Sequence, residues 1–412
     1  MQAPSADRTG AGGPRRAALA FVVVTVVLDM MALGMIVPVL PKLVVTFEHG
    51  DTASAARIYG VFGTVWALMQ FVFSPVLGAL SDRFGRRPVI LLSSLGLGLD
   101  YLLMAWAPTL GWLFLGRVIS GITAATFATA SAYIADVTPP ERRAGAFGML
   151  GASFGLGFVL GPAVGGILGH YGPRLPFWVA GAFSLVNVCY GFFVLPESLP
   201  LDRRAAFSWG RANPLGSLRL LRSHRELFGL AAATFLGYVA HEVLPSTFVL
   251  YTTYRYGWNE RSVGLVMAAM GVCGMIVSGG LVQPIVTRFG ERRTLLAALA
   301  CGMLGFIAYG VAPRGAFVFI GVPLQALWGM WTPAAQGLMT RRVDASAQGQ
   351  LQGATSSLRG IAGLFGPTLF TQTFALFIGP RAAWHLPGAP FLLGSGLLAA
   401  SATLAWRVTR SP

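Results

Sequence analysis

Apolar stretches long enough to cross a lipid bilayer recur along the whole chain, and they constrain its fold more than any other feature. About 20 apolar residues in a helix span the ~30 Å hydrocarbon core, and a helix satisfies its own backbone hydrogen bonds where no water is present. The 412 residues are 55% hydrophobic and 11% charged, whereas a typical soluble domain has about 25% charged residues. The mean hydropathy is +0.66. These values exclude a soluble globular enzyme and predict an all-α membrane protein.

Twelve transmembrane helices are expected from the apolar stretches. The predicted spans are 17–41, 58–80, 88–107, 112–135, 144–169, 176–195, 227–251, 262–287, 294–312, 316–340, 349–378 and 389–406. An even number of crossings places both termini on one side of the membrane.

Basic residues are distributed unequally between the two sides that these spans define. The side that carries both termini has 21 Arg, whereas the opposite side has seven Arg and Lys residues. Positive charge is typical of cytoplasmic loops, so both termini are expected in the cytoplasm. The bias accounts for the net charge of +15 without a nucleic-acid partner. Abundant Arg beside scarce Lys is typical of a GC-rich bacterium, and we expect a multi-pass protein of the bacterial inner membrane.

The chain divides into two halves that resemble each other. A cytoplasmic tail at 1–16 precedes a six-helix half at 17–195, a polar linker at 196–226, a second six-helix half at 227–406 and a tail at 407–412. DRFGRR at 82–87 returns as TRFGER at 287–292, and GP at 161–162 returns at 366–367, both 205 positions later; VLP at 39–41 returns at 243–245. The repeat predicts pseudo-symmetric halves with a substrate site between them near the midplane.

Six ionisable side chains lie within the predicted spans, where a charge costs about 2.5–3.5 kcal/mol at the helix centre. They are the acids Asp29, Asp100 and Glu242 and the basic residues Arg117, His241 and Arg359. Such residues typically face a bundle interior or a wet cavity and mark ion pathways. Because burial of a carboxyl group favours its protonated form, Asp29 and Asp100 are candidate proton carriers.

Structural interpretations of the same residues stay open. The two aspartates can bridge helices, Glu242 can be solvated near the outer face, and His241 can be a packed polar residue. Arg117 can extend to the membrane surface, whereas Arg359 is too deep for this. Gln70 and Gln336 are neutral groups that line a cavity or join helices.

The cytoplasmic segment GALSDRFGRRP at 78–88 combines a tight glycine turn with charges of both signs. These charges can pair across neighbouring helix ends and form a latch that opens in one state. The predicted gating residues are Asp82, Arg83, Arg86, Arg87 and Asp136. The alternative is anchoring by positive charge with incidental pairing.

The segment LGPAVGG at 160–166 lies in the fifth span. Its glycines allow another helix to approach closely, and Pro162, next to Gly161, removes a backbone hydrogen bond. The pattern predicts a tightly packed, bent helix, and we include both residues among the gating positions.

These motifs resemble those of the major facilitator superfamily. The segment at 78–88 is similar to its signature loop, and GPAVGG at 161–166 to the motif of its drug/proton antiporter branch. A closer resemblance, to the tetracycline/proton antiporters, covers nearly the whole chain. It includes LDMMALGMIVPVLP at 28–41, LDYLLMA at 99–105, AYIADVTPPERRAGAFG at 132–148, LPES at 195–198 and YGWN at 256–259. The resemblance implies the major facilitator fold of twelve helices in two halves.

The resemblance also implies roles for single residues. Asp29, Gln70, Asp100 and Arg117 fall on the family's polar membrane positions, and Asp82 and Asp136 fall on its gating acids. The family's Asp in span nine and His in span eight are absent here. The second half instead offers His241, Glu242 and Arg359.

We therefore expect a proton-driven antiporter that exports an amphiphilic drug, tetracycline-like or another antibiotic, by alternating access. Its partners are the small-molecule substrate, protons and the lipid bilayer, with a monomer as the working unit. We expect no cofactor; a divalent cation enters only as part of a chelated substrate if tetracycline is exported. The alternatives are a symporter or uniporter for a small metabolite and, from another class, a non-transporting membrane sensor.

No catalytic or metal-binding pattern stands out in the sequence. Cys189, Cys273 and Cys301 lie in apolar stretches without metal-ligand spacing and are interpreted as packing residues. Neither a nucleophile triad nor a phosphate-binding loop is recognisable, so the chain is not expected to be an enzyme.

Overall fold

The computed structural model describes residues 13–124, 126–205, 216–222, 225–344, 347–380 and 382–410. Within these ranges the regular structure is helical, without strands, which confirms the predicted all-α class. Eleven helical stretches are long and apolar enough to cross a membrane. One of them, Glu260–Val311, has 52 residues, or roughly 78 Å at 1.5 Å per residue, and so contains two crossings. The chain therefore has twelve.

Parts of the predicted tails and linker lie outside the described residues, namely 1–12, 206–215, 223–224 and 411–412. The helices of the first half are α1 (Gly13–Ile36), α2 (Leu40–Phe47), α3 (Thr52–Phe84), α4 (Arg86–Trp106), α5 (Leu110–Thr123), α6 (Thr126–Val137), η1 (Pro140–Arg142), α7 (Arg143–Tyr171) and α8 (Leu175–Val194). Two short 3₁₀ segments follow, η2 (Leu201–Arg203) and η3 (Gly216–Arg222). The second half contains α9 (Arg225–His241), α10 (Val243–Tyr256), α11 (Glu260–Ile276), the π-helical η4 (Val277–Leu281), α12 (Val282–Val311), η5 (Gly315–Phe317), α13 (Val318–Trp328), α14 (Trp331–Thr340), α15 (Gln348–Ile378) and α16 (Ala389–Val408).

Four spans that we predicted as continuous are interrupted, the first near its end and the other three near their middle. The breaks fall between α1 and α2, between α5 and α6, between α9 and α10, and between α13 and α14. The ends of α1 and α9, Ile36 and His241, are 205 positions apart, and so are the ends of α5 and α13, Thr123 and Trp328. The repeat read from the sequence therefore includes the helix breaks.

Proline accounts for three of the four breaks. Pro38 disfavours a helical conformation of the residue before it, and α1 ends at Ile36. Pro245 and Pro333 lie at the third positions of α10 and α14, where their missing N–H groups leave the carbonyls four residues earlier without helical partners. The VLP motif repeated at 39–41 and 243–245 thus marks the restart of a broken helix in each half.

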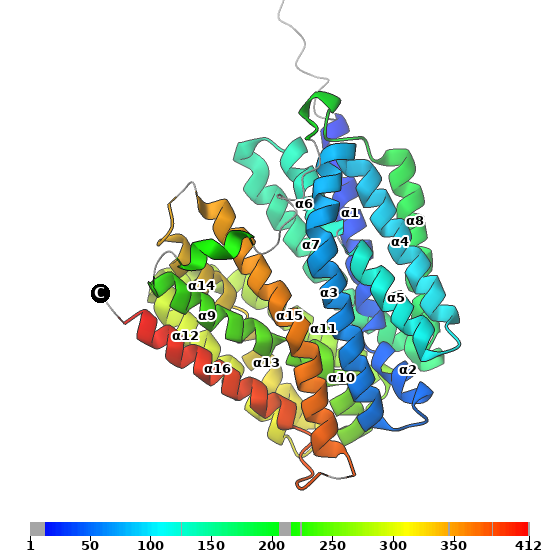
Figure 1. Ribbon diagram of the computed structural model, residues 1–412, viewed down its shortest axis with the longest axis vertical. Coiled ribbons are helices and arrows are strands. Elements are labelled where there is room, and N and C mark those ends of the chain that lie inside the picture. The colour runs from blue at the N-terminus through cyan, green and yellow to red at the C-terminus, as the bar shows by residue number, and fades with distance from the viewer. Residues whose placement is uncertain are drawn as a thin grey trace, which may run out of the picture.

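The twelve crossings form two six-helix halves that meet along two seams, as the fold prediction requires (Figure 1). Within the first half α1 packs on α7 and α8, and within the second half α16 packs on α9 and α12. Between the halves α3 packs along α15, and α7 packs along α11. The internal repeat relates the two seams, because it places α7 on α15 and α3 on α11.

Both seams depend on small residues at the points of contact. A methyl group at Gly63 would lie 2.8 Å from Cβ of Pro367, and one at Gly271 would lie 2.5 Å from a methyl of Val159. The hydroxyls of Thr64 and Thr368 are 2.8 Å apart across the α3–α15 seam. Figure 1 shows that α3 and α15 run side by side in the lower part of the view and diverge toward the top.

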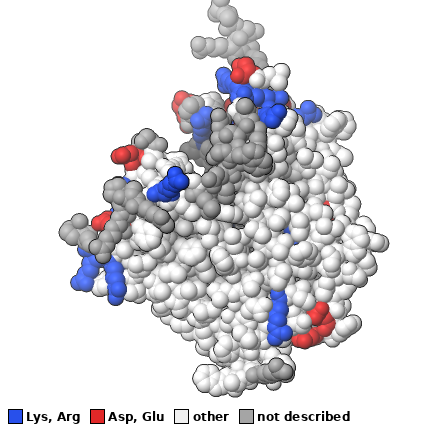
Figure 2. Space-filling model, in the orientation of Figure 1, with Lys and Arg blue, Asp and Glu red and all other residues white. Residues whose placement is uncertain are grey.

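The two ends of the molecule differ in charge and in how closely the halves approach. We call the end with Lys42 and Glu260, where the halves are joined, the closed end. The opposite, arginine-rich end carries the loop at 78–88 and the first and last described residues, Gly13 and Arg410. Figure 2 shows a nearly uncharged band across the middle of the visible face, with basic side chains gathered mostly at the arginine-rich end. This band is the surface expected to contact lipid.

Two turns at the arginine-rich end show the repeat in the backbone. Gly85, between α3 and α4, has φ 106° and ψ 162°, and Gly290, 205 positions later, has φ 78° and ψ 158°. A side chain would be strained in both conformations. The glycines of the repeated RFG motif therefore reverse the chain in the same way in each half.

Candidate functional site

Asp29 lies on α1, about two turns before the break, and is 2% exposed. The Asn187 amide on α8 donates to its Oδ1 at 3.2 Å, and the Ser94 hydroxyl on α4 donates to its Oδ2 at 3.5 Å. Thr25 in turn donates to Oδ1 of Asn187 at 3.1 Å. Asp29 thus joins three helices inside the first half. The sequence analysis missed Asn187, although it is the only amide in its span.

Asp100 lies on α4 and has different surroundings. It is 0% exposed, and neither carboxyl oxygen has a hydrogen-bond partner among the described residues. The group faces α5, because a methyl at Gly116 would lie 2.7 Å from its Oδ1. The Ser120 hydroxyl lies close to it without a hydrogen bond of ordinary geometry. Burying an ionised carboxylate in this way is costly, and binding a proton removes the cost.

Arg117 lies on the neighbouring helix α5 and is also buried. Its guanidinium lies 5.4 Å from the centroid of the Trp66 ring on α3, a cation–π contact. It acts electrostatically on Asp100 and on Tyr59, and the Tyr59 hydroxyl donates to the Pro245 carbonyl of the second half at 3.4 Å. Tyr59, which the sequence analysis also missed, therefore connects the polar groups of the two halves.

His241 and Glu242 occupy the break between α9 and α10. Glu242 packs against α15 at Gly366, where a side chain would overlap its Cβ. The exposed His241 has its ring 5.8 Å from that of Trp328, at the end of α13. Trp328 stacks on Trp331 with centroids 6.0 Å apart and 13° between the planes. The two broken spans of the second half therefore meet through aromatic rings.

Other polar groups of the predicted site lie on α3, α13, α14 and α15. Arg359 on α15 is exposed and acts electrostatically on both His241 and Glu242. The indole N–H of Trp328 and the amide nitrogen of Gln336 are buried without partners among the described residues. Unpaired donors of this kind are costly unless a ligand or water satisfies them. Gln70, half-buried on α3, lies next to Phe71, which packs on Gly360 across the seam.

Three of the five predicted gating charges, Asp82, Arg86 and Asp136, form one cluster at the arginine-rich end. Arg86 pairs with Asp82, donates through Nε to Asp136 at 3.1 Å and donates through Nη1 to Ser81 at 2.7 Å. Its backbone N–H donates to Glu197 at 2.8 Å. All these partners belong to the first half, so the cluster ties α3, α4 and α6 to the segment after α8.

The guanidinium groups of the other two arginines of this motif lie outside that cluster, although the Arg87 backbone N–H donates to Glu197 at 3.3 Å. Arg83 stacks on Phe84 at 5.1 Å, and the Arg87 guanidinium donates to the Phe192 carbonyl. In the second half Glu291 pairs with Arg341 at 3.0 Å. These two residues lie 205 positions after Arg86 and Asp136, and their charges are reversed.

Gly161 and Pro162 lie where α7 is packed on both sides. A methyl at Gly161 would be 2.7 Å from Cα of Gly34 on α1. On the other side, Gly264 of α11 lies against the Pro162 carbonyl, leaving no room for a side chain. The close approach expected from the glycine spacing is therefore present, and it joins α7 to both halves.

No group of three or more potential metal ligands occurs among the described residues.

Known proteins resemble the chain over almost its full length. A model of the Major Facilitator Superfamily matches residues 22–367. The chain is 38% identical over 380 residues to the class C tetracycline resistance protein of Escherichia coli, which covers 92% of this chain and 94% of that protein. It is 39% identical over 363 residues to the class G protein of Vibrio anguillarum, covering 87% and 90%.

Solved structures show the same fold. A bacterial homolog of the human lysosomal transporter Spinster, in an inward-facing and unoccupied conformation, superposes with a TM-score of 0.79 at 17% identity, covering 97% of this chain and 98% of that one. The human organic anion transporter MFSD10 superposes with a TM-score of 0.70 at 24% identity, covering 95% and 99%.

Proposed function

The chain belongs to the major facilitator superfamily, and on this premise we propose that it is a proton-coupled antiporter that exports an amphiphilic, tetracycline-like drug by alternating access. It is a multi-pass membrane transporter homologous to tetracycline resistance proteins. One observation carries the proposal: in a chain homologous to tetracycline resistance proteins, the Asp100 carboxyl group is buried without a hydrogen-bond partner among the described residues. The names of the relatives supply the substrate class.

Asp100 is the proton carrier in this proposal. Its carboxyl oxygens have no hydrogen bond of ordinary geometry among the described residues. Asp29, in contrast, accepts hydrogen bonds from Ser94 and Asn187 and serves as a fixed polar link. Arg117, beside Asp100, supplies a permanent positive charge that favours release of the proton. In this scheme the movement of the two halves couples protonation of Asp100 in the first half to drug binding in the second half.

The second half supplies the drug site in this proposal. The half-buried ring of Tyr238 offers a surface for the planar, apolar part of a drug. The buried ring of Trp331, with its centroid 5.1 Å from that of Tyr238, and the buried ring of Trp328 support it from within the protein. Glu242 and the amide of Gln336 offer polar partners at its edge. A chelated divalent cation, if the drug carries one, is part of the substrate, and the proton gradient supplies the energy.

The arginine-rich end faces the cytoplasm in this proposal. That side of the membrane has 21 basic residues, whereas the opposite side has seven. This distribution follows the orientation rule for inner-membrane proteins. Both termini are then cytoplasmic, the closed end faces outward, and the divergence of the halves in Figure 1 is toward the cytoplasm. We propose a monomer as the transporting unit.

Drug accumulation in everted membrane vesicles tests the coupling. We expect accumulation to require the proton gradient and to collapse when an uncoupler is added. Asp100→Asn should reduce gradient-driven accumulation by more than about tenfold, because an amide binds no proton in this range. The same variant should keep drug counterflow in proteoliposomes, which needs no net proton movement. Asp202→Asn, in the exposed η2 segment, is the matched control.

Three outcomes would contradict the proposal in different ways. Accumulation that resists the uncoupler excludes proton coupling, and full activity of Asp100→Asn excludes Asp100 as the carrier. Transport in the opposite direction favours a symporter, whereas absence of counterflow for every drug tested favours a sensor.

A further inference from the structure

We propose that Lys42 and Glu260 form a lock that holds the closed end shut and breaks each time the two halves rock apart. The proposal rests on the alternating-access part of the proposed function and is independent of the drug and of proton coupling. It assigns a conformational role to two residues at the edge of the membrane-spanning region.

Lys42 is the only lysine in a chain that otherwise uses arginine for its positive charges. An ammonium group is a compact charge on a flexible stem and is strongly hydrated. Such a group can leave its partner for water at low cost, whereas a guanidinium tends to form bidentate pairs that are harder to separate. A contact that must break in every cycle therefore suits lysine better than arginine.

The contacts of Lys42 cross from one half to the other. Its Nζ lies 3.3 Å from a Glu260 carboxylate oxygen, and the side chains of Lys42 and Glu260 are 14% and 21% exposed. The same Nζ donates to the Trp258 carbonyl at 2.8 Å. Lys42 belongs to the short α2 of the first half. In the second half Glu260 is the first residue of α11, and Trp258 lies in the turn just before that helix. One ammonium group thus binds two acceptors of the opposite half.

The surroundings fix Glu260 at the seam. A methyl at Gly169 of α7 would lie 3.2 Å from the Glu260 Cβ, and one at Gly166 would lie 2.5 Å from its backbone carbonyl. Asn259 caps α11 through the Ser262 N–H at 2.9 Å, which holds the first turn in place. Because α7 and α11 form one of the two seams, separation of this seam carries Glu260 away from Lys42.

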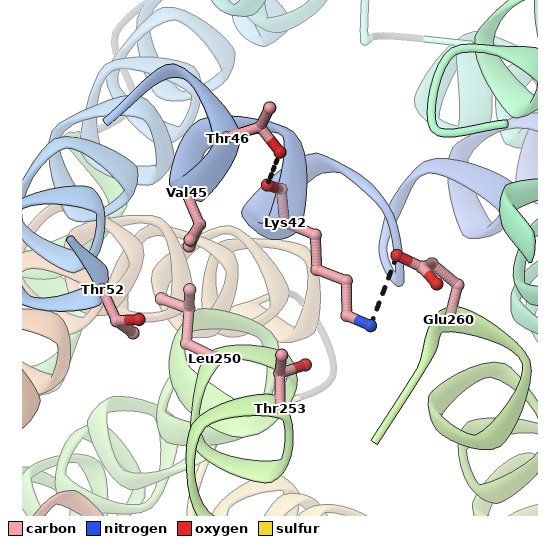
Figure 3. A pocket seen from close by; sticks show the side chains of 7 residues that line it. All are labelled: Lys42, Val45, Thr46, Thr52, Leu250, Thr253 and Glu260. Carbon is pink, nitrogen blue, oxygen red and sulfur yellow. Dashed lines mark hydrogen bonds and ion pairs between the residues drawn. The ribbon is translucent and has the colours of Figure 1, made fainter. Parts of the chain in front are cut away.

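A pocket beside the pair has room for the water that hydrates the two charges when they separate. Its volume is about 250 Å³, and it is lined by Val45, Thr46 and Thr52 of the first half, by Leu250 and Thr253 of the second, and by the pair itself (Figure 3). Figure 3 shows the Lys42 stem crossing between the two halves toward Glu260. The pocket exists only while both halves contribute walls, so it belongs to the closed state.

The pair forms only in the closed state. It therefore shifts the equilibrium between the closed and open states by the full free energy of the interaction. A partly buried pair with an additional carbonyl partner is less screened by water than an exposed pair. We expect loss of the pair to raise the population open at this end roughly three- to tenfold.

Distances between spin labels test the lock directly. Labels on Thr109→Cys and Arg314→Cys, at exposed closed-end positions of the two halves, are placed in a chain whose three cysteines are replaced by serine. We expect one dominant short distance for the parent and a larger long-distance population for Lys42→Gln and for Glu260→Gln. The double variant should match the single variants, because each already removes the same pair.

Glu48→Gln is the matched control, since it removes a carboxylate at the same end that bonds to Ser54 and not to Lys42. An unchanged distance distribution in both single variants, or an equal change in Glu48→Gln, would overturn the lock. The distances need neither drug nor gradient, so failure of drug export in the parent chain would contradict the proposed function alone.

A membrane-impermeant amine reagent offers a second measurement on the native chain. Lys42 carries the only side-chain amine, and acylation at this residue is measured by peptide mass spectrometry. We expect slow acylation in the parent and an increase of roughly three- to tenfold in Glu260→Gln but not in Glu48→Gln. Equal rates in all three chains would count against the lock.

Discussion

At the scale of single residues, the two aspartates of the first half show that depth in the membrane does not determine a role. Asp29 and Asp100 are both buried, yet only Asp29 has hydrogen-bond donors from Asn187 and Ser94. The sequence identified both acids from their position in apolar spans. It did not distinguish them, because the donors come from other helices whose side-chain directions hydropathy does not reveal.

The donor Asn187 provides a test of the structural role of Asp29. Asn187→Leu leaves the Asp29 carboxyl group with one fewer donor in a buried site, which costs about 1.5–3 kcal/mol when the acceptor is charged. We expect a lower midpoint of thermal unfolding in detergent. Cys189→Ser, at an exposed position on the same helix, should leave it unchanged. An unaltered midpoint in Asn187→Leu would show that Asp29 does not depend on this bond.

At the scale of helices, α7 depends on glycine at some positions and not at others. Gly161 touches the backbone of Gly34, whereas Gly148, on the same helix, has nothing within 4 Å of an added methyl. Gly161→Ala should therefore force α1 and α7 apart at a cost of about 1–3 kcal/mol. Gly148→Ala should be neutral or stabilise by up to about 1 kcal/mol, because alanine favours a helix.

Thermal unfolding and drug export, measured on both α7 variants, check this expectation. A loss of stability in Gly161→Ala with none in Gly148→Ala supports close packing as the reason for the glycine motif. Equal effects of the two substitutions would assign the motif to helix flexibility instead.

The number of spans was predictable, whereas their continuity was not. Hydropathy locates a crossing because about 20 apolar residues match the bilayer, but it does not detect a break within one. The signal for a helix break is present in the sequence as Pro38, Pro245 and Pro333. The sequence analysis uses the VLP motif only as evidence for a repeat, not for a break. The break after Thr123 has no proline, and we find no local cause for it in the sequence.

At the scale of the whole molecule, the repeat explains why two seams join the halves in the same way. The repeat relates α7 to α15 and α11 to α3, so the contact between α7 and α11 is equivalent to the contact between α15 and α3. Both pairs of helices contact each other from their middle toward the closed end. Of the residues that the sequence analysis missed, Asn187 acts inside the first half, whereas Tyr59 contacts the second half through the Pro245 carbonyl. Such contacts follow from how the halves dock, which a linear pattern does not specify.

The α3–α15 seam should separate at the closed end during each cycle if the halves rock as rigid bodies. A Cβ at Gly60 would lie 3.2 Å from the Cβ of Thr371, close to the ~3.5–4.5 Å separation in disulfides. In a chain without other cysteines, Gly60→Cys with Thr371→Cys should form a disulfide on oxidation. Drug export should then stop and should return when a reductant is added, because the bond holds this end shut. Each single variant, oxidised and reduced alike, controls for the substitutions themselves. Export that continues while mass spectrometry shows complete cross-linking would mean that the halves move by sliding along this seam instead of opening it.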